Sequence, residues 1–139
     1  LDGFFVSGNL TLIEGEARSE FVRNNAKLRL EDQANVIANL STGFENDRVT
    51  ARVSGTYVGN RLESVNATTE VLDVIRAPLL TIDVNFRFNL TDGIQLYADV
   101  VNITNEVDYR YTRGIDGFGI VDRTSDYGRT FQIGAIVNF

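Results

Sequence analysis

The chain has 139 residues, enough for one domain, and it carries a net charge of −6 with neither histidine nor cysteine. An acidic chain without basic clusters argues against a nucleic-acid partner. The commonest pairings of a general base with a nucleophile need histidine or cysteine, so we expect no enzyme activity and no bound cofactor.

Six segments alternate apolar and polar residues at every second position, which is the pattern of β-strands. In the fourth segment, Ile82, Val84 and Phe86 share one face, and Asp83 and Asn85 lie on the other. The sequence therefore predicts an all-β protein with about six long antiparallel strands in up-and-down order. The predicted strands span residues 4–12, 36–44, 49–57, 82–90, 94–100 and 131–139.

The connections between these segments alternate between short and long. Residues 45–48 and 91–93 form tight turns, where Asn, Asp and Gly tolerate the positive φ that hairpins need. Long loops cover roughly residues 16–32, 61–77 and 105–126. All the short turns therefore fall at one end of the sheet and all the long loops at the other. This asymmetry is typical of outer-membrane β-barrels, which have short periplasmic turns and long extracellular loops.

The length and number of the strands indicate part of a transmembrane barrel. The alternating segments run about 9 residues, enough to cross a bilayer core when tilted. Six strands are too few to close a barrel, since the smallest have about eight, and an open edge in lipid would leave backbone groups unsatisfied. We therefore expect the chain to belong to a longer barrel. The absence of an initiator Met and of a signal peptide points the same way.

The last predicted strand ends on an aromatic residue and carries apolar side chains at alternate positions. It resembles the C-terminal signal by which the barrel-assembly machinery recognises outer-membrane proteins. The physical basis would be β-augmentation, in which an extended strand with alternate apolar anchors pairs with an exposed edge. The predicted assembly signal consists of Phe131, Ile133, Ala135, Val137 and Phe139.

Several motifs together resemble the late barrel of TonB-dependent receptors. They are Gly8-Asn9, residues 30–39, residues 96–106 and Tyr127-Gly128-Arg129-Thr130-Phe131, and they cover nearly the whole chain. The resemblance implies a barrel of about 22 strands around an N-terminal plug domain, with a TonB box facing the periplasm. Residues 1–139 would be the C-terminal portion of that barrel, without plug or TonB box.

The resemblance also implies a location in the outer membrane of a Gram-negative bacterium. The expected partners are outer-membrane lipid, the rest of the barrel with its plug domain, TonB through the missing N-terminal part, and the barrel-assembly machinery. The transported ligand would be a ferric siderophore, haem, cobalamin or an oligosaccharide. The alternative is a soluble or secreted β-sandwich that binds a ligand or carbohydrate, with its apolar faces packed together.

The third long loop is the richest in side chains suited to ligand recognition. Tyrosine and phenylalanine offer flat apolar surface, and arginine offers forked donors for carboxylate or catecholate oxygens. Alternatively, the tyrosines belong to an aromatic girdle at the membrane interface and the arginines balance nearby aspartates. The predicted ligand contacts are Tyr109, Arg110, Tyr111, Arg113, Phe118 and Arg123.

Four aspartates, Asp108, Asp116, Asp122 and Asp126, lie in the same loop. A calcium site needs several oxygen ligands that converge within a short loop. These aspartates are spread out and separated by aromatic and basic residues. We therefore expect a solvated acidic loop and no metal site.

Overall fold

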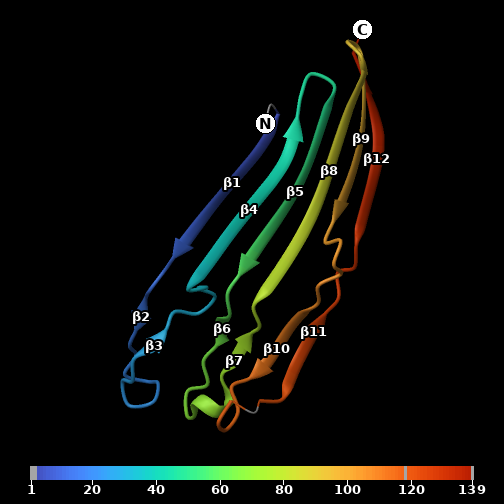
Figure 1. Cartoon of the computed structure of the whole chain (residues 1–139). Helices are drawn as coiled ribbons and strands as arrows, with labels where there is room; N and C mark the ends of the chain where they lie inside the picture. The colour runs from blue at the N-terminus through green and yellow to red at the C-terminus, as the bar shows by residue number, and fades with distance from the viewer. Residues whose placement is uncertain (1–2, 118, 139) are drawn as a thin grey trace.

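A computed structural model describes residues 3–117 and 119–138 and shows an all-β protein dominated by one long sheet (Figure 1). The order of its six strands follows the chain, and every neighbouring pair is antiparallel. The predicted up-and-down order is therefore confirmed, and each strand coincides with a predicted segment to within a few residues. The strands are β1 Phe4–Leu12, β4 Val36–Glu45, β5 Val49–Val58, β8 Leu79–Thr91, β9 Ile94–Val101 and β12 Thr130–Val137.

Short strands occupy much of the predicted long loops, at the end of the sheet opposite the tight turns and the two chain termini (Figure 1). Four of them form a second sheet in the order β11-β10-β7-β6, which we call the loop-end sheet. Its strands are β6 Arg61–Ser64, β7 Val74–Arg76, β10 Asp108–Thr112 and β11 Val121–Ser125. The remaining elements are the paired strands β2 Glu16–Ala17 and β3 Leu28–Arg29, and the 3-10 turn η1 Glu70–Leu72.

The strand register places the six apolar faces on the same side of the long sheet. Residues paired across an antiparallel ladder point to the same side. One such row crosses the whole sheet and is apolar except for a single threonine. Its members are Val6, Thr42, Val53, Val84, Val100 and Phe131.

This apolar face is exposed. Val6 at one edge strand is 73% exposed, Ile133 at the other is 86% exposed, and Phe86 in the middle of the sheet is still 42% exposed. Within the described residues, no second layer covers the face. The buried apolar side chains, Leu62, Ile75 and Ala34, lie instead at the loop end.

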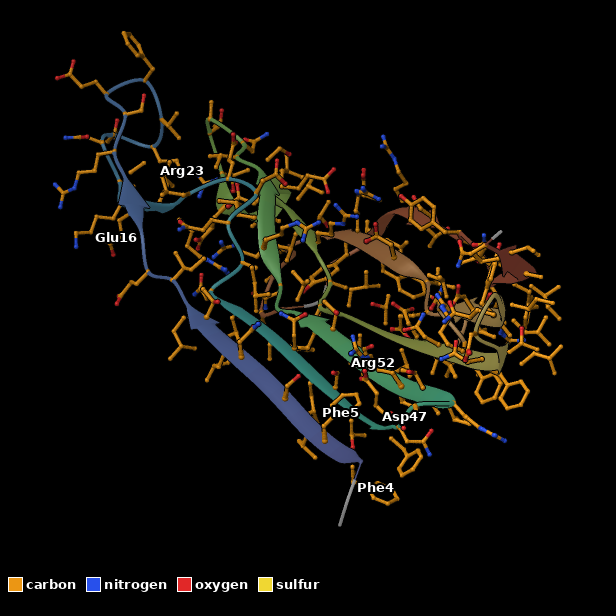
Figure 2. All side chains as sticks on the ribbon, turned by 90° about the horizontal axis from the view of Figure 1, so that it is seen from above. Phe4, Phe5, Glu16, Arg23, Asp47 and Arg52 are labelled. Carbon is orange, nitrogen blue, oxygen red and sulfur yellow. The ribbon has the colours of Figure 1, made fainter. Side chains whose placement is uncertain are left out.

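The opposite face of the long sheet is polar, and its side chains bond to one another across the strands. Asn39 donates to Asn9 at 2.9 Å and accepts from the hydroxyl of Thr56 at 2.9 Å. The Arg52 guanidinium lies 5.1 Å from the centre of the Phe5 ring, and the two side chains approach each other in Figure 2. Cross-strand pairs of this kind stabilise a sheet by roughly 0.2–1 kcal/mol each.

The long sheet is open. In the described part of the chain no pairing joins β1 to β12, which stand at its two edges. Each edge therefore presents a row of backbone groups available to a further strand. Among the same residues, no helix is long and apolar enough to span a membrane.

Candidate functional site

The candidate site is the loop end, because the buried side chains of the described residues and most of their ion pairs lie there. A corner at Asn102 joins the long sheet to the loop-end sheet. The backbone N–H of Asn102 donates to Asp83 at 2.9 Å, and the φ of Asn102 is +55°, a left-handed conformation that Asn tolerates better than most residues.

The buried side chain of Asn102 bonds to three backbone groups. Its Oδ1 accepts from the N–H of Glu106 at 2.9 Å, and its Nδ2 donates to the carbonyls of Glu106 at 3.3 Å and Gly128 at 3.0 Å. The corner thereby ties the segment that enters β10 to the segment that leaves β11. The sequence places Asn102 in the motif of residues 96–106 but does not predict these bonds.

Asp108 is buried between two arginines of the loop-end sheet. Arg76 donates to both of its carboxylate oxygens, with 2.9 Å between Arg76 Nε and Asp108 Oδ1. Arg110 Nη1 lies 3.5 Å from Asp108 Oδ2, and Arg110 Nε donates to Glu63 Oε2 at 2.6 Å. The hydrogen bonds from Arg76 hold the pKa of Asp108 below its usual value, although burial of the carboxylate opposes this shift.

The prediction that Asp108 belongs to a solvated acidic loop is wrong. Strand pairing brings Arg76 and Arg110 against this carboxylate, which the linear sequence does not show. Asp116, Asp122 and Asp126 are exposed. Among residues 3–117 and 119–138, no three acidic side chains come close enough to hold a metal ion.

A second buried aspartate, Asp73, links all three long loops. Arg23 of the first loop pairs with Asp73 of the second, and Arg113 Nη2 of the third lies 3.5 Å from Asp73 Oδ2. Arg23 Nε also donates to the carbonyl of Asn66 at 3.0 Å, and the Asn66 N–H donates to Asp73 Oδ1 at 2.9 Å. Figure 2 shows Arg23 at this end of the molecule. Asp73 and Arg23 were not expected from the sequence to have any role.

The six predicted ligand contacts do not form one cluster. Tyr109 and Tyr111 alternate with Arg110 along β10, so the two tyrosines lie on one face and Arg110 on the other. Arg123 is the register partner of Arg110 and shares its face. Arg110 and Arg113 are both held by carboxylates of the chain itself. Phe118 lies outside the described residues.

The tyrosines are the predicted contacts best placed to meet a ligand. Tyr111 pairs with Ile75, which pairs with Leu62. Val58 pairs with Leu79 on the polar side of the long sheet, and four residues further along both strands Leu62 pairs with Ile75. Because the register does not shift between these two pairs, we infer that Leu62, Ile75 and Tyr111 lie on the polar side as well. Tyr109 is 45% exposed. The ligand role of these residues stays a prediction.

The predicted assembly signal lies on β12, an edge strand of the long sheet. Phe131, Ile133, Ala135 and Val137 all point to the apolar side and are exposed. The free edge and the alternate apolar side chains are what β-augmentation requires. Phe139 lies outside the described residues, and the signalling role stays a prediction.

Comparison with known proteins finds no match: no protein-family model fits the chain, and no curated protein or solved structure is significantly similar to it. A functional assignment therefore depends on the sequence pattern and on the geometry described above.

We predict that Asn102→Ala lowers the free energy of unfolding by about 1–3 kcal/mol, because three backbone groups lose their partner. Urea unfolding followed by circular dichroism measures the change. Thr104→Ala, at an exposed position in the same segment, should shift stability by less than about 0.5 kcal/mol. Asn102→Gly removes the bonds without backbone strain, so wild-type stability in that variant would contradict the bonding role.

We predict that Asp108→Asn destabilises the fold at neutral pH, by an amount that shrinks as the pH is lowered. Because folding lowers the pKa of Asp108, its charged form stabilises the fold at any pH above the pKa of the unfolded state, which is about 3.9. This stabilisation is lost as the pH falls through the pKa of the folded state. Urea unfolding at neutral and acidic pH compares the variant with wild type. The exposed Asp116→Asn is the control, and a difference that is independent of pH would refute the role of the charge.

Proposed function

We propose that this chain forms part of the wall of an outer-membrane β-barrel of the TonB-dependent receptor type. The whole receptor would import a scarce nutrient, such as a ferric siderophore, haem, cobalamin or an oligosaccharide, with energy derived through TonB. The observation that carries the proposal is the apolar face of the long sheet, which is exposed across all six strands. An apolar surface this extensive would promote aggregation in water and is well matched to lipid tails.

The dimensions of the sheet support a membrane location. Its strands have between 8 and 13 residues, compared with about 9–11 for a tilted transmembrane strand. Tight turns lie at one end and all the long loops at the other (Figure 1). In outer-membrane barrels the turns face the periplasm and the loops face outward.

The open edges supply the reason for a larger assembly. In lipid, the unpaired backbone groups of β1 and β12 would each cost several kcal/mol. Further strands of the same barrel would pair with both edges. The polar face, with its Asn, Ser, Thr and Arg side chains, would then line the interior, where water and the plug domain satisfy it.

A soluble β-sandwich is less well supported. A sandwich needs a second sheet over the face that carries Val84 and Phe86. None of the described elements covers this face, and the apolar core that does exist lies at the loop end around Leu62 and Ile75. The sandwich remains the outcome to be tested against.

The test uses the absence of cysteine in the chain, which allows single labels to be introduced. Val53→Cys and Val84→Cys would place a fluorophore on the apolar face, and Ser54→Cys and Asn85→Cys would place it on the polar face. In the complete protein reconstituted in phosphatidylcholine vesicles, lipids with brominated acyl chains should quench the first pair and spare the second. Equal quenching of both pairs, or a protein that stays soluble without lipid, would refute the membrane proposal.

We predict that replacing Tyr109 and Tyr111 together by Ala weakens ligand binding about tenfold, because aromatic anchors dominate binding sites of this kind. Haemin, cyanocobalamin and a catecholate ferric siderophore are the probes, measured on cells at equal surface abundance of the receptor. Tyr127→Ala, an exposed tyrosine outside the loop-end sheet, should leave binding unchanged. Unchanged affinity in the double variant would move recognition to the plug or to other loops.

A further inference from the structure

Four arginines stand side by side across the loop-end sheet. Arg123 pairs in register with Arg110, Arg110 with Arg76, and Arg76 with Arg61. Like charges placed directly opposite one another destabilise a sheet, so this arginine row needs negative charge close by. The chain as a whole is acidic, with a net charge of −6, so the row does not follow from a basic composition.

Among the described residues, carboxylates make hydrogen bonds with the two middle arginines of the row alone. Asp108 and Glu63 bond to Arg76 and Arg110. At one end, the nearest carboxylate oxygen to Arg61 belongs to Asp32, which is 71% exposed, and lies 3.8 Å away.

At the other end of the row, Arg123 is exposed. No hydrogen bond or ion pair joins its side chain to another residue in the described ranges. Both end arginines therefore keep donors available for an external anion.

The strand register places the arginine row on the apolar side of the molecule. Tyr57 pairs with Leu80 on the apolar face, and four residues further along both strands Arg61 pairs with Arg76. Residues 59–60 and 77–78 belong to no strand, but the register is the same on both sides of them, so we infer that the alternation of side chains is preserved. Arg110 and Arg123 share this side because they are register partners in the same row.

The height of the row matches the headgroup layer of a membrane. At about 3.3 Å per residue, four residues beyond Tyr57 and Leu80 correspond to roughly 13 Å along the strand, or about 10 Å in height for a strand tilted by about 40°. Headgroup regions begin where the apolar band ends. The arginine row would therefore lie just outside the acyl chains, on the loop side.

From these observations we propose that the arginine row binds the phosphate groups of a lipid headgroup in the outer leaflet. This inference rests on the proposed function and identifies a lipid contact for it. Guanidinium groups match phosphate with two parallel hydrogen bonds, and charge-assisted bonds of this kind are among the strongest in proteins. Arg61 and Arg123 make the contact, and Asp108 and Glu63 hold Arg76 and Arg110 in position between them.

The experiment measures lipid binding to the complete barrel in detergent by native mass spectrometry. The probes are lipid A, its dephosphorylated form and inorganic phosphate. The test variant carries Arg61→Gln and Arg123→Gln. The matched control carries Arg18→Gln and Arg48→Gln, which removes the same charge from exposed arginines at the two ends of the molecule, outside the row.

We expect wild type and control to bind lipid A about tenfold or more tightly than its dephosphorylated form, and the test variant to lose this preference. Inorganic phosphate should not displace the lipid. Equal lipid A binding by test and control variants, or displacement by inorganic phosphate at comparable concentration, would overturn the inference. Circular dichroism of each variant confirms that it is folded.

The outcome separates the two proposals. If lipids with brominated chains quench the Val84 label and the arginine variants still bind lipid A normally, only the headgroup contact is wrong. If the Val84 label is not quenched, the membrane location itself is wrong.

Discussion

The shared register of the six long strands determines what each side of the molecule is made of. Partners across an antiparallel ladder point to the same side, and pairs such as Val53 with Val84 and Phe88 with Leu96 keep the apolar residues together. A register shift of one residue between any two strands would move all the apolar side chains of one strand to the polar face, among Asn, Asp and Arg residues. The register is therefore the reason why this single-layered sheet has one apolar face and one polar face.

A single layer cannot bury its own side chains, so the fully buried side chains of the described residues lie where the chain folds back on itself at the loop end. The buried groups there include Asp73 and Asp108, and each lies between two arginines. Leaving a buried carboxylate unpaired costs several kcal/mol, so each aspartate fixes the positions of the arginines that pair with it. Asp73 does so for three loops at once, and loops fixed in this way are suited to recognition.

The period-two pattern and the turn residues predicted the long strands, because both are local properties of the chain. The Asn46 side chain, for instance, accepts from the N–H groups of Arg48 and Val49 within the turn itself, and Asn89 of the neighbouring strand adds two bonds to the turn carbonyls. The loop end could not be predicted in this way. Arg76 meets Asp108 across 32 residues, and the contact exists only once two separate hairpins have paired. The solvated role expected for Asp108 was wrong for that reason.

The corner at Asn102 determines on which side of the loop-end sheet the tyrosines and the arginines of β10 lie. Arg76 lies eight positions before Val84, whereas its partner Arg110 lies ten positions after Val100. The corner therefore contains two more residues than the strand opposite. An even excess keeps the side-chain alternation, and an odd one would reverse it. Reversal would turn Tyr109 and Tyr111 toward the side of the apolar face and Arg110 toward the interior. Under the proposed function, the corner thus keeps aromatic side chains where a ligand would enter and arginines where lipid headgroups lie.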